Sequence, residues 1–108
     1  MANATAVTTN RGREQFHGIF NEMWEVRATI DVDSLLTGAS DTDTVAVPGV
    51  ALGDVVIGFA LGVSLAGIQA TAYVSAANTV TLVFQNTTGS TVNLGETSLR
   101  LVVARPGF

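Results

Sequence analysis

A run of 41 consecutive residues, from Val55 to Gly95, contains no Asp, Glu, Lys, Arg or His. The run holds more than a third of the 108-residue chain and consists mainly of aliphatic residues, small polar residues and glycine. Most catalysis uses a titratable or nucleophilic side chain that other groups hold in place. The run therefore predicts a packed structural protein that interacts with other proteins, and not an enzyme.

The composition predicts that part of the apolar surface is covered by another protein. Hydrophobic residues make up 47% of the chain and charged residues only 13%, whereas soluble domains average about 25% charged. A chain of this length forms about one domain, and such a small fold has much surface for its volume. Extensive exposed apolar surface usually marks an interface. We therefore expect an obligate oligomer or a subunit of a larger assembly.

Other classes of partner are disfavoured by the same sequence. The longest run without a strongly polar side chain, 55–68, is interrupted by Ser64 and is shorter than the roughly 20 residues of a membrane-spanning helix. The N-terminus lacks the basic-then-apolar order of a signal peptide. The net charge of −4 disfavours nucleic acid. The lack of cysteine excludes disulfides and thiolate metal sites. We expect no membrane, no nucleic acid and no cofactor.

Alternating apolar and polar residues predict an all-β domain over residues 24–108. From Trp24 to Asp33 the alternation has a period of two over ten residues, which is typical of a half-buried strand. Further strands are predicted over 44–47, 55–61, 68–75, 79–85 and 97–105, with a short one at 92–94. The turns between them are closely spaced and favour antiparallel hairpins. The pattern predicts an antiparallel β-sandwich or small barrel of six to seven strands.

The expected strand at 55–61 is apolar on both faces, so we expect both to be covered. One predicted face carries its odd-numbered side chains, which are Val55, Ile57, Phe59 and Leu61.

Residues 1–23 are expected to lie outside the sandwich as an extended N-terminal arm followed by an apolar anchoring segment. Residues 1–14 are small and polar and cannot form a core. Apolar residues then recur at helical spacing up to Trp24. Gly18 weakens a helix by about 1 kcal/mol relative to alanine, so a short helix and a packed irregular segment both remain open.

Three short motifs resemble one family of modules. The chain reads VPGVALGD over 47–54, AYVSAANTV over 72–80 and NTTG over 86–89. In this order and spacing they resemble a small β-sandwich module of structural proteins of tailed bacteriophages, and the match covers roughly residues 28–105. The residues themselves suit turns, since Pro48 fixes its own φ and Gly49 permits a positive φ. Asp54 can accept hydrogen bonds from turn amides at the entry to a strand.

The resemblance implies a part of the virion without enzymatic activity. Members of the family are head decoration (cement) proteins, and modules of tail or fibre components. We therefore expect a decoration protein on the capsid surface that forms a homotrimer and binds the major capsid protein. A tail, fibre or adaptor component is the alternative, and a carbohydrate-binding module for host attachment ranks below it, with Tyr73 as its candidate residue.

The candidate interface residues lie in the first 24 residues, outside the resemblance. Arg11 and Arg13 could anchor the arm to acidic residues of a neighbouring subunit, or could belong to a solvated tail. Large apolar side chains dominate interface energetics, and they could alternatively cover one open end of the sandwich. These candidates are Phe16, Phe20, Met23 and Trp24.

Two clusters of possible metal ligands fit other roles better. His17, Glu22 and Glu25 match no familiar zinc spacing. Five aspartates, two of them in an Asp-Val-Asp pair and two in an Asp-Thr-Asp pair, could supply oxygen ligands to Ca²⁺ but show no EF-hand spacing. We interpret them as a solvated acidic edge that discourages strand-to-strand aggregation. They are Asp31, Asp33, Asp41, Asp43 and Asp54.

Overall fold

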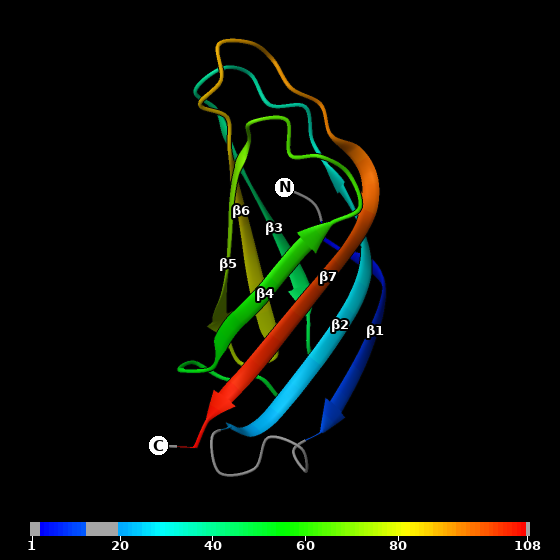
Figure 1. Ribbon diagram of the computed structural model, residues 1–108, viewed down its shortest axis with the longest axis vertical. Coiled ribbons are helices and arrows are strands. Elements are labelled where there is room, and N and C mark those ends of the chain that lie inside the picture. Colours follow the sequence, from blue (N-terminus) through cyan, green and yellow to red (C-terminus); the bar gives the residue numbers. More distant parts are fainter. Residues whose placement is uncertain (1–2, 13–19, 108) are drawn as a thin grey trace.

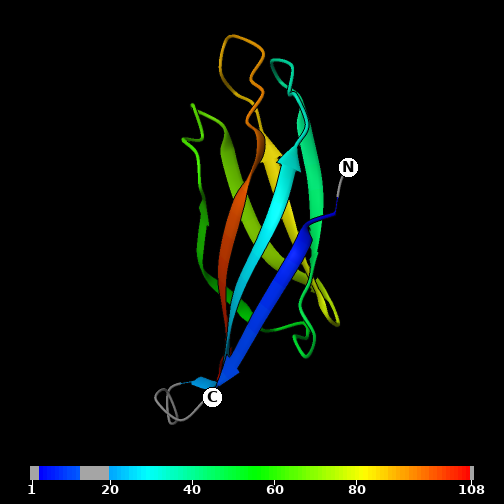
Figure 2. The same ribbon diagram turned by 90° about the vertical axis from the view of Figure 1, so that its right-hand side faces the viewer.

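The computed structural model describes residues 3–12 and 20–107, and within them every regular element is a β-strand. The seven strands are β1 (Thr5–Gly12), β2 (Phe20–Val32), β3 (Ser40–Ala46), β4 (Val55–Leu61), β5 (Gln69–Ala76), β6 (Thr79–Gln85) and β7 (Gly95–Pro106). They form two antiparallel sheets, ordered β1-β2-β7-β4 and β3-β6-β5. Figures 1 and 2 show the two sheets as facing layers. The predicted antiparallel β-sandwich is confirmed.

The larger sheet is built around one long pair of strands. β2 and β7 have 13 and 12 residues and pair from Phe20 opposite Pro106 to Val32 opposite Gly95. β1 pairs with the free side of β2, and β4 pairs with the free side of β7. No helix in the described part of the chain is long and apolar enough to cross a membrane.

The core lies between the sheets, on the faces that the alternation predicted. In β6 the side chains of Val80, Leu82 and Phe84 are fully buried. The inward faces of β2 and β7 are buried in the same way, which includes Trp24, Val26, Ile30, Leu99, Leu101 and Val103. Full burial of a large aliphatic or aromatic side chain stabilises a fold by about 1.5–3 kcal/mol relative to exposure. These strands therefore supply most of the core.

The predicted faces of β4 were wrong because the strand contains a β-bulge. Val56 pairs with Val103 and Gly58 with Val102, so Ile57 is an extra residue without an opposite partner. The bulge shifts the alternation by one residue within the strand. Val55 and Ile57 point outward and are 42% and 51% exposed, whereas Phe59 is partly buried and packs against the core. The face carrying Val55 and Ile57 is therefore not covered by this chain.

The N-terminal arm does not lie apart from the sandwich. Residues 5–12 form β1, which pairs with β2 from Thr5 opposite Thr29 to Gly12 opposite Met23. β2 begins at Phe20, so the expected boundary between residues 23 and 24 falls inside a strand, and the helical alternative fails from Phe20 onward. An edge strand can join a sheet through backbone hydrogen bonds alone. The polar side chains of β1 therefore did not reveal this strand in the sequence.

Candidate functional site

Trp24 lies at the end of the sandwich where β2 begins and β7 ends. Its side chain is fully buried, and its indole N–H donates a hydrogen bond to the carbonyl oxygen of Pro48 at 3.2 Å. Two guanidinium groups contact its ring. The central carbon of Arg11 lies 5.0 Å from the ring centroid and that of Arg105 lies 5.2 Å from it. Both distances are within the range of a cation–π interaction.

Acidic side chains neutralise both arginines. Arg11, whose side chain is 47% exposed, forms an ion pair with Glu22. Arg105 donates two hydrogen bonds of 2.9 Å to Asp54, one to each carboxylate oxygen. It also donates to the carbonyl oxygen of Gly49 at 2.9 Å. We call these five residues, Arg11, Glu22, Trp24, Asp54 and Arg105, the Trp24 cluster.

The Asp54 carboxylate is the most enclosed charge of the Trp24 cluster, with a side chain only 4% exposed. Burial alone would raise the pKa of Asp54, but the hydrogen bonds from Arg105 and from the Ala51 amide, together with the charge of Arg105, lower it overall. The hydrogen bond to Asp54 raises the pKa of Arg105 in turn. Both groups are therefore held in their charged forms, and a firmly paired carboxylate is poorly suited to proton transfer.

Two of the three motifs that carry the family resemblance, 47–54 and 72–80, form one structural unit beside this cluster. Asn78 exchanges backbone hydrogen bonds with Val47 and Val50, and its side-chain oxygen accepts from the Gly49 amide at 2.8 Å. Gly49 has a φ of +99°, as the predicted turn requires, and a Cβ there would lie 2.8 Å from Arg11. These contacts hold the turn against the hairpin, so a structural role explains why these residues stand at these positions.

The structure brings together four of the six candidate interface residues. Arg11 and Trp24 are opposite each other in the pairing of β1 with β2, and Met23 and Phe20 lie further along β2. Trp24 is buried inside the domain and offers nothing to a partner, so its assignment to the interface is corrected. Phe20 and Met23 are partly buried. Arg13 and Phe16 lie outside the described residues.

An exposed leucine lies at the same end of the molecule. Leu52 is 72% exposed, in the 47–54 loop that packs on the Trp24 cluster. Leu36 is similarly exposed, at 67%, and belongs to the loop between β2 and β3, which lies at the opposite end of the sandwich (Figure 1). In this loop Leu35 pairs with Val92. The loop at this second end is held by Asn86, which is fully buried and donates to the carbonyl oxygens of Leu35 and Ser90.

The aspartates do not form the single solvated edge that was expected. Asp31 and Asp33 are exposed, but Asp43 is fully buried in β3 and Asp54 belongs to the Trp24 cluster. Within residues 3–12 and 20–107, no group of three or more His, Cys, Asp or Glu side chains is placed to hold a metal ion. His17 lies outside those ranges.

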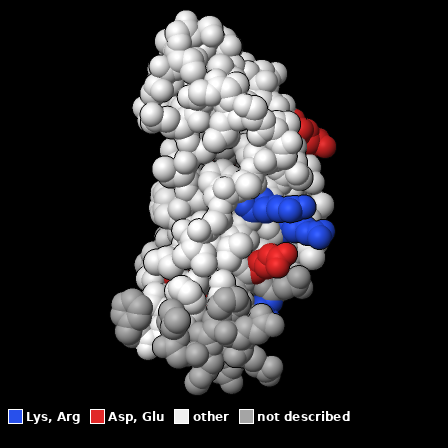
Figure 3. Space-filling model, in the orientation of Figure 1, with Lys and Arg blue, Asp and Glu red and all other residues white. Residues whose placement is uncertain are grey.

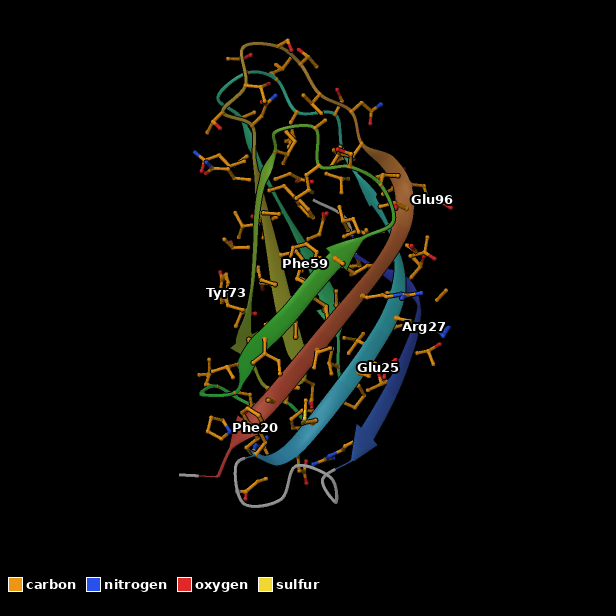
Figure 4. All side chains as sticks on the ribbon, viewed as in Figure 1. Phe20, Glu25, Arg27, Phe59, Tyr73 and Glu96 are labelled. Atoms are coloured by element: carbon orange, nitrogen blue, oxygen red, sulfur yellow. The ribbon has the colours of Figure 1, made fainter. Side chains whose placement is uncertain are left out.

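Most of the exposed apolar surface is elsewhere, along β4 and β5. Five of the seven large hydrophobic side chains found exposed in the described residues belong to these two strands or to their connection. They are Val55, Ile57, Val63, Leu65 and Tyr73. Figure 4 shows Tyr73 projecting outward from β5, on the side of the view opposite to Glu25, Arg27 and Glu96. The outward position of Val55 and Ile57 was not predicted, because the bulge left no recognisable sequence signal.

A groove of about 340 Å³ separates β4 from β5. It is lined by Val56, Ile57, Gly58 and Phe59 from β4, and by Ala70, Thr71 and Ala72 from β5. All of these groups are uncharged, so the groove offers a mostly apolar surface. Compared with protein-family models, curated proteins and solved structures, the chain gives no match, so its function is argued from its own residues.

Proposed function

We propose that this chain is a structural protein of a tailed-bacteriophage particle. In this proposal it is a decoration protein that binds the major capsid protein at the capsid surface as a homo-oligomer, with a trimer expected. The observation that carries the proposal is the large uncharged apolar surface along β4 and β5 on a domain with so few charged residues. A surface of this kind favours lasting contact with protein. The sequence motifs resembling phage modules point to the same class of protein.

A decoration protein acts by thermodynamic linkage. A ligand that binds only the assembled lattice stabilises it by about 2.7 kcal/mol per site when its free concentration is 100 times its dissociation constant. An oligomer also ties neighbouring capsid subunits together, because its second contact forms at a high effective concentration. Neither effect needs a catalytic group, which agrees with the paired charges of the Trp24 cluster.

The end of the sandwich that carries the Trp24 cluster is the better candidate for the lattice-facing surface. It combines the 72% exposed Leu52 with the partly buried Phe20 and Met23 and the half-exposed Arg11. An apolar anchor surrounded by polar groups is a common arrangement in binding sites. The cluster beneath is cross-linked by hydrogen bonds, so this surface is held in one shape before binding.

Binding to empty phage heads tests the proposal. The purified chain should co-sediment with expanded or unexpanded empty heads of its phage. Leu52→Asp should weaken this binding at least tenfold, because it places a charge in an apolar contact. Leu36→Asp is the matched control, since that leucine is similarly exposed at the opposite end. Failure of the unaltered chain to bind heads would overturn the proposed function, and equal binding by both variants would overturn the choice of end.

Location in the virion distinguishes the alternative role in a tail, fibre or adaptor. A decoration protein is present in hundreds of copies over the head, whereas tail components are few and confined to the tail. Immunolabelling of intact particles against this chain should mark the head surface. Labelling restricted to the tail would replace the decoration role with the tail role.

A further inference from the structure

The two long sides of the sandwich differ in how their strand edges are treated. On one side, β1 and β3 end their sheets and are joined by a backbone hydrogen bond of 2.9 Å from the Ala4 amide to the Thr44 carbonyl. On the other side, β4 and β5 end their sheets with the groove between them, and no described strand pairs with either outer edge. We call this second side, formed by β4, β5 and the 62–68 connection, the open side.

The side formed by β1 and β3, which we call the closed side, carries more of the features that usually block edge-to-edge pairing. Such features include charged residues on an edge strand, inward-pointing charges and local irregularities. β1 has Arg11, a register shift and a positive φ at Ala6, and β3 has the buried Asp43. β4 and β5 contain no charge and no proline, and only β4 has a bulge in mid-strand. β5 is regular from Gln69 to Val74. The open side is therefore left available for pairing.

We propose that a second copy of this chain docks on the open side, so that this side faces the symmetry axis of the homo-oligomer. The proposal deepens the proposed function and rests on it only for the biological setting. Free backbone N–H and C=O groups on the edge of β5 can extend the sheet into that of a neighbour. The exposed apolar side chains, Ile57 and Tyr73 among them, are then removed from water.

Charge favours a second copy over an unrelated partner. The chain carries a net charge of −4, so most encounters between copies are repulsive. The open side lies within the 41 residues that contain no Asp, Glu, Lys, Arg or His, so two copies can meet there without bringing like charges together. In Figure 3 the charged side chains in view gather over β2 and β7, and almost none appear over β4 and β5.

The area is sufficient for a stable contact. The molecule measures 46 × 26 × 22 Å. The rectangle spanned by its longest and shortest dimensions is about 1,000 Å², so one long side can hold the roughly 800 Å² that a standard interface buries on each partner. Closed symmetric oligomers repeat one contact between copies, which is self-complementary in a dimer and head-to-tail in a trimer or larger ring.

Sedimentation of Thr71→Lys tests this proposal without phage heads. Thr71 is exposed on β5 and lines the groove, so lysine there should leave the domain folded but place like charges in the interface. The unaltered chain at micromolar concentration should sediment as a multimer, and Thr71→Lys should shift to the 11.2 kDa monomer. Thr8→Lys is the matched control, since it makes the same change on exposed β1 and should leave the multimer intact. A thermal melt confirms that both variants are folded.

Each outcome is decisive. A monomeric unaltered chain, or a multimer that survives Thr71→Lys, would overturn the proposal. Because the chain has no cysteine, single cysteines at Gln69, Thr71 or Tyr73 supply a second measurement. At least one should form a disulfide-linked dimer on oxidation, and none doing so would also count against the open side. These results are separate from head binding, so a multimer that does not bind heads would keep this inference and reject the proposed function.

Discussion

Among single residues, Asp54 and Arg105 connect parts of the chain that lie far apart in sequence. Their ion pair joins β7 to the loop before β4, and Arg105 also contacts Trp24 and the Gly49 carbonyl. The pair is 51 residues apart in sequence and mostly enclosed. Removing one partner of such a pair leaves the other charge poorly solvated, and this costs more than the pair itself contributes.

We predict that Asp54→Ala destabilises the fold in a pH-dependent way. Hydrogen bonds to a charged group contribute about 1.5–3 kcal/mol, so the free energy of unfolding at pH 7 should fall by about 2–3 kcal/mol. The folded-state pKa of Asp54 lies below its ordinary value of 3.8. Its contribution is therefore complete above pH 4 to 5 and is lost as the pH falls through the folded-state pKa.

Urea unfolding at pH 7 and pH 3, at one protein concentration, measures this difference. The gap between Asp54→Ala and the unaltered chain should be smaller at pH 3. Asp31→Ala is the control, because Asp31 is exposed on β2 and its removal should change stability by no more than about 0.5 kcal/mol. An equal gap at both pH values would mean that the carboxylate charge does not stabilise the fold.

Local turn chemistry was predictable from the sequence, but this long-range pairing was not. The turn at Pro48 and Gly49 involves neighbouring residues, and the hydrogen bond that Asp54 accepts from the Ala51 amide spans only a few positions. The partner of Asp54 depends on where β7 passes, which no local pattern encodes. The same reason explains why Trp24 was assigned to an interface when its neighbours in fact bury it.

Among elements, the predictable strands are those whose side chains face the core. β2, β6 and β7 alternate because one face of each is buried, and alternation is what a sequence displays. β1 lies at a sheet edge, and none of its side chains whose burial is described is fully buried, so its sequence resembles that of an arm. β4 was found as a strand, but its bulge reversed the faces after Ile57.

We predict that Arg11→Ala loosens β1 without unfolding the domain. Arg11 ties β1 to β2 through Glu22 and the Trp24 ring, and such contacts together contribute about 1 kcal/mol at a half-exposed site. Hydrogen exchange of the β1 amides should become roughly five- to tenfold faster, since 1.4 kcal/mol is tenfold. Exchange in β6 should stay within about twofold. Arg100→Ala, on β7, is the control and should leave β1 unchanged.

Exchange that rises equally in β1 and β6 would mean that Arg11 stabilises the whole fold.

The place of β1 in the sheet also limits what deletion of the N-terminal region can test. Deleting residues 1–23 removes β1 and the start of β2, and so uncovers the edge of β2 and breaks the Trp24 cluster. A truncation of that extent therefore tests stability together with binding, whereas Leu52→Asp tests binding alone.

At the scale of the whole molecule, the sequence predicts a sandwich with exposed apolar surface but not where that surface lies. The run from Val55 to Gly95 contains buried β6 and exposed β4 and β5 alike. Their difference follows from sheet order, in which β6 is central while β4 and β5 are edges. Sheet order is set by long-range pairing, so it could not be read from residues that are equally apolar.

We predict that salt does not weaken the contact between copies on the uncharged open side. Raising NaCl from 0.1 M to 1 M shortens the screening length from about 10 Å to about 3 Å. An interface held by ion pairs weakens under this change, whereas burial of apolar surface does not depend on charge. Each copy carries a net charge of −4, and screening reduces the repulsion between copies. The dissociation constant of the multimer, measured by sedimentation, should therefore stay constant or fall. A tenfold rise would place charged residues in the contact and move it away from β4 and β5.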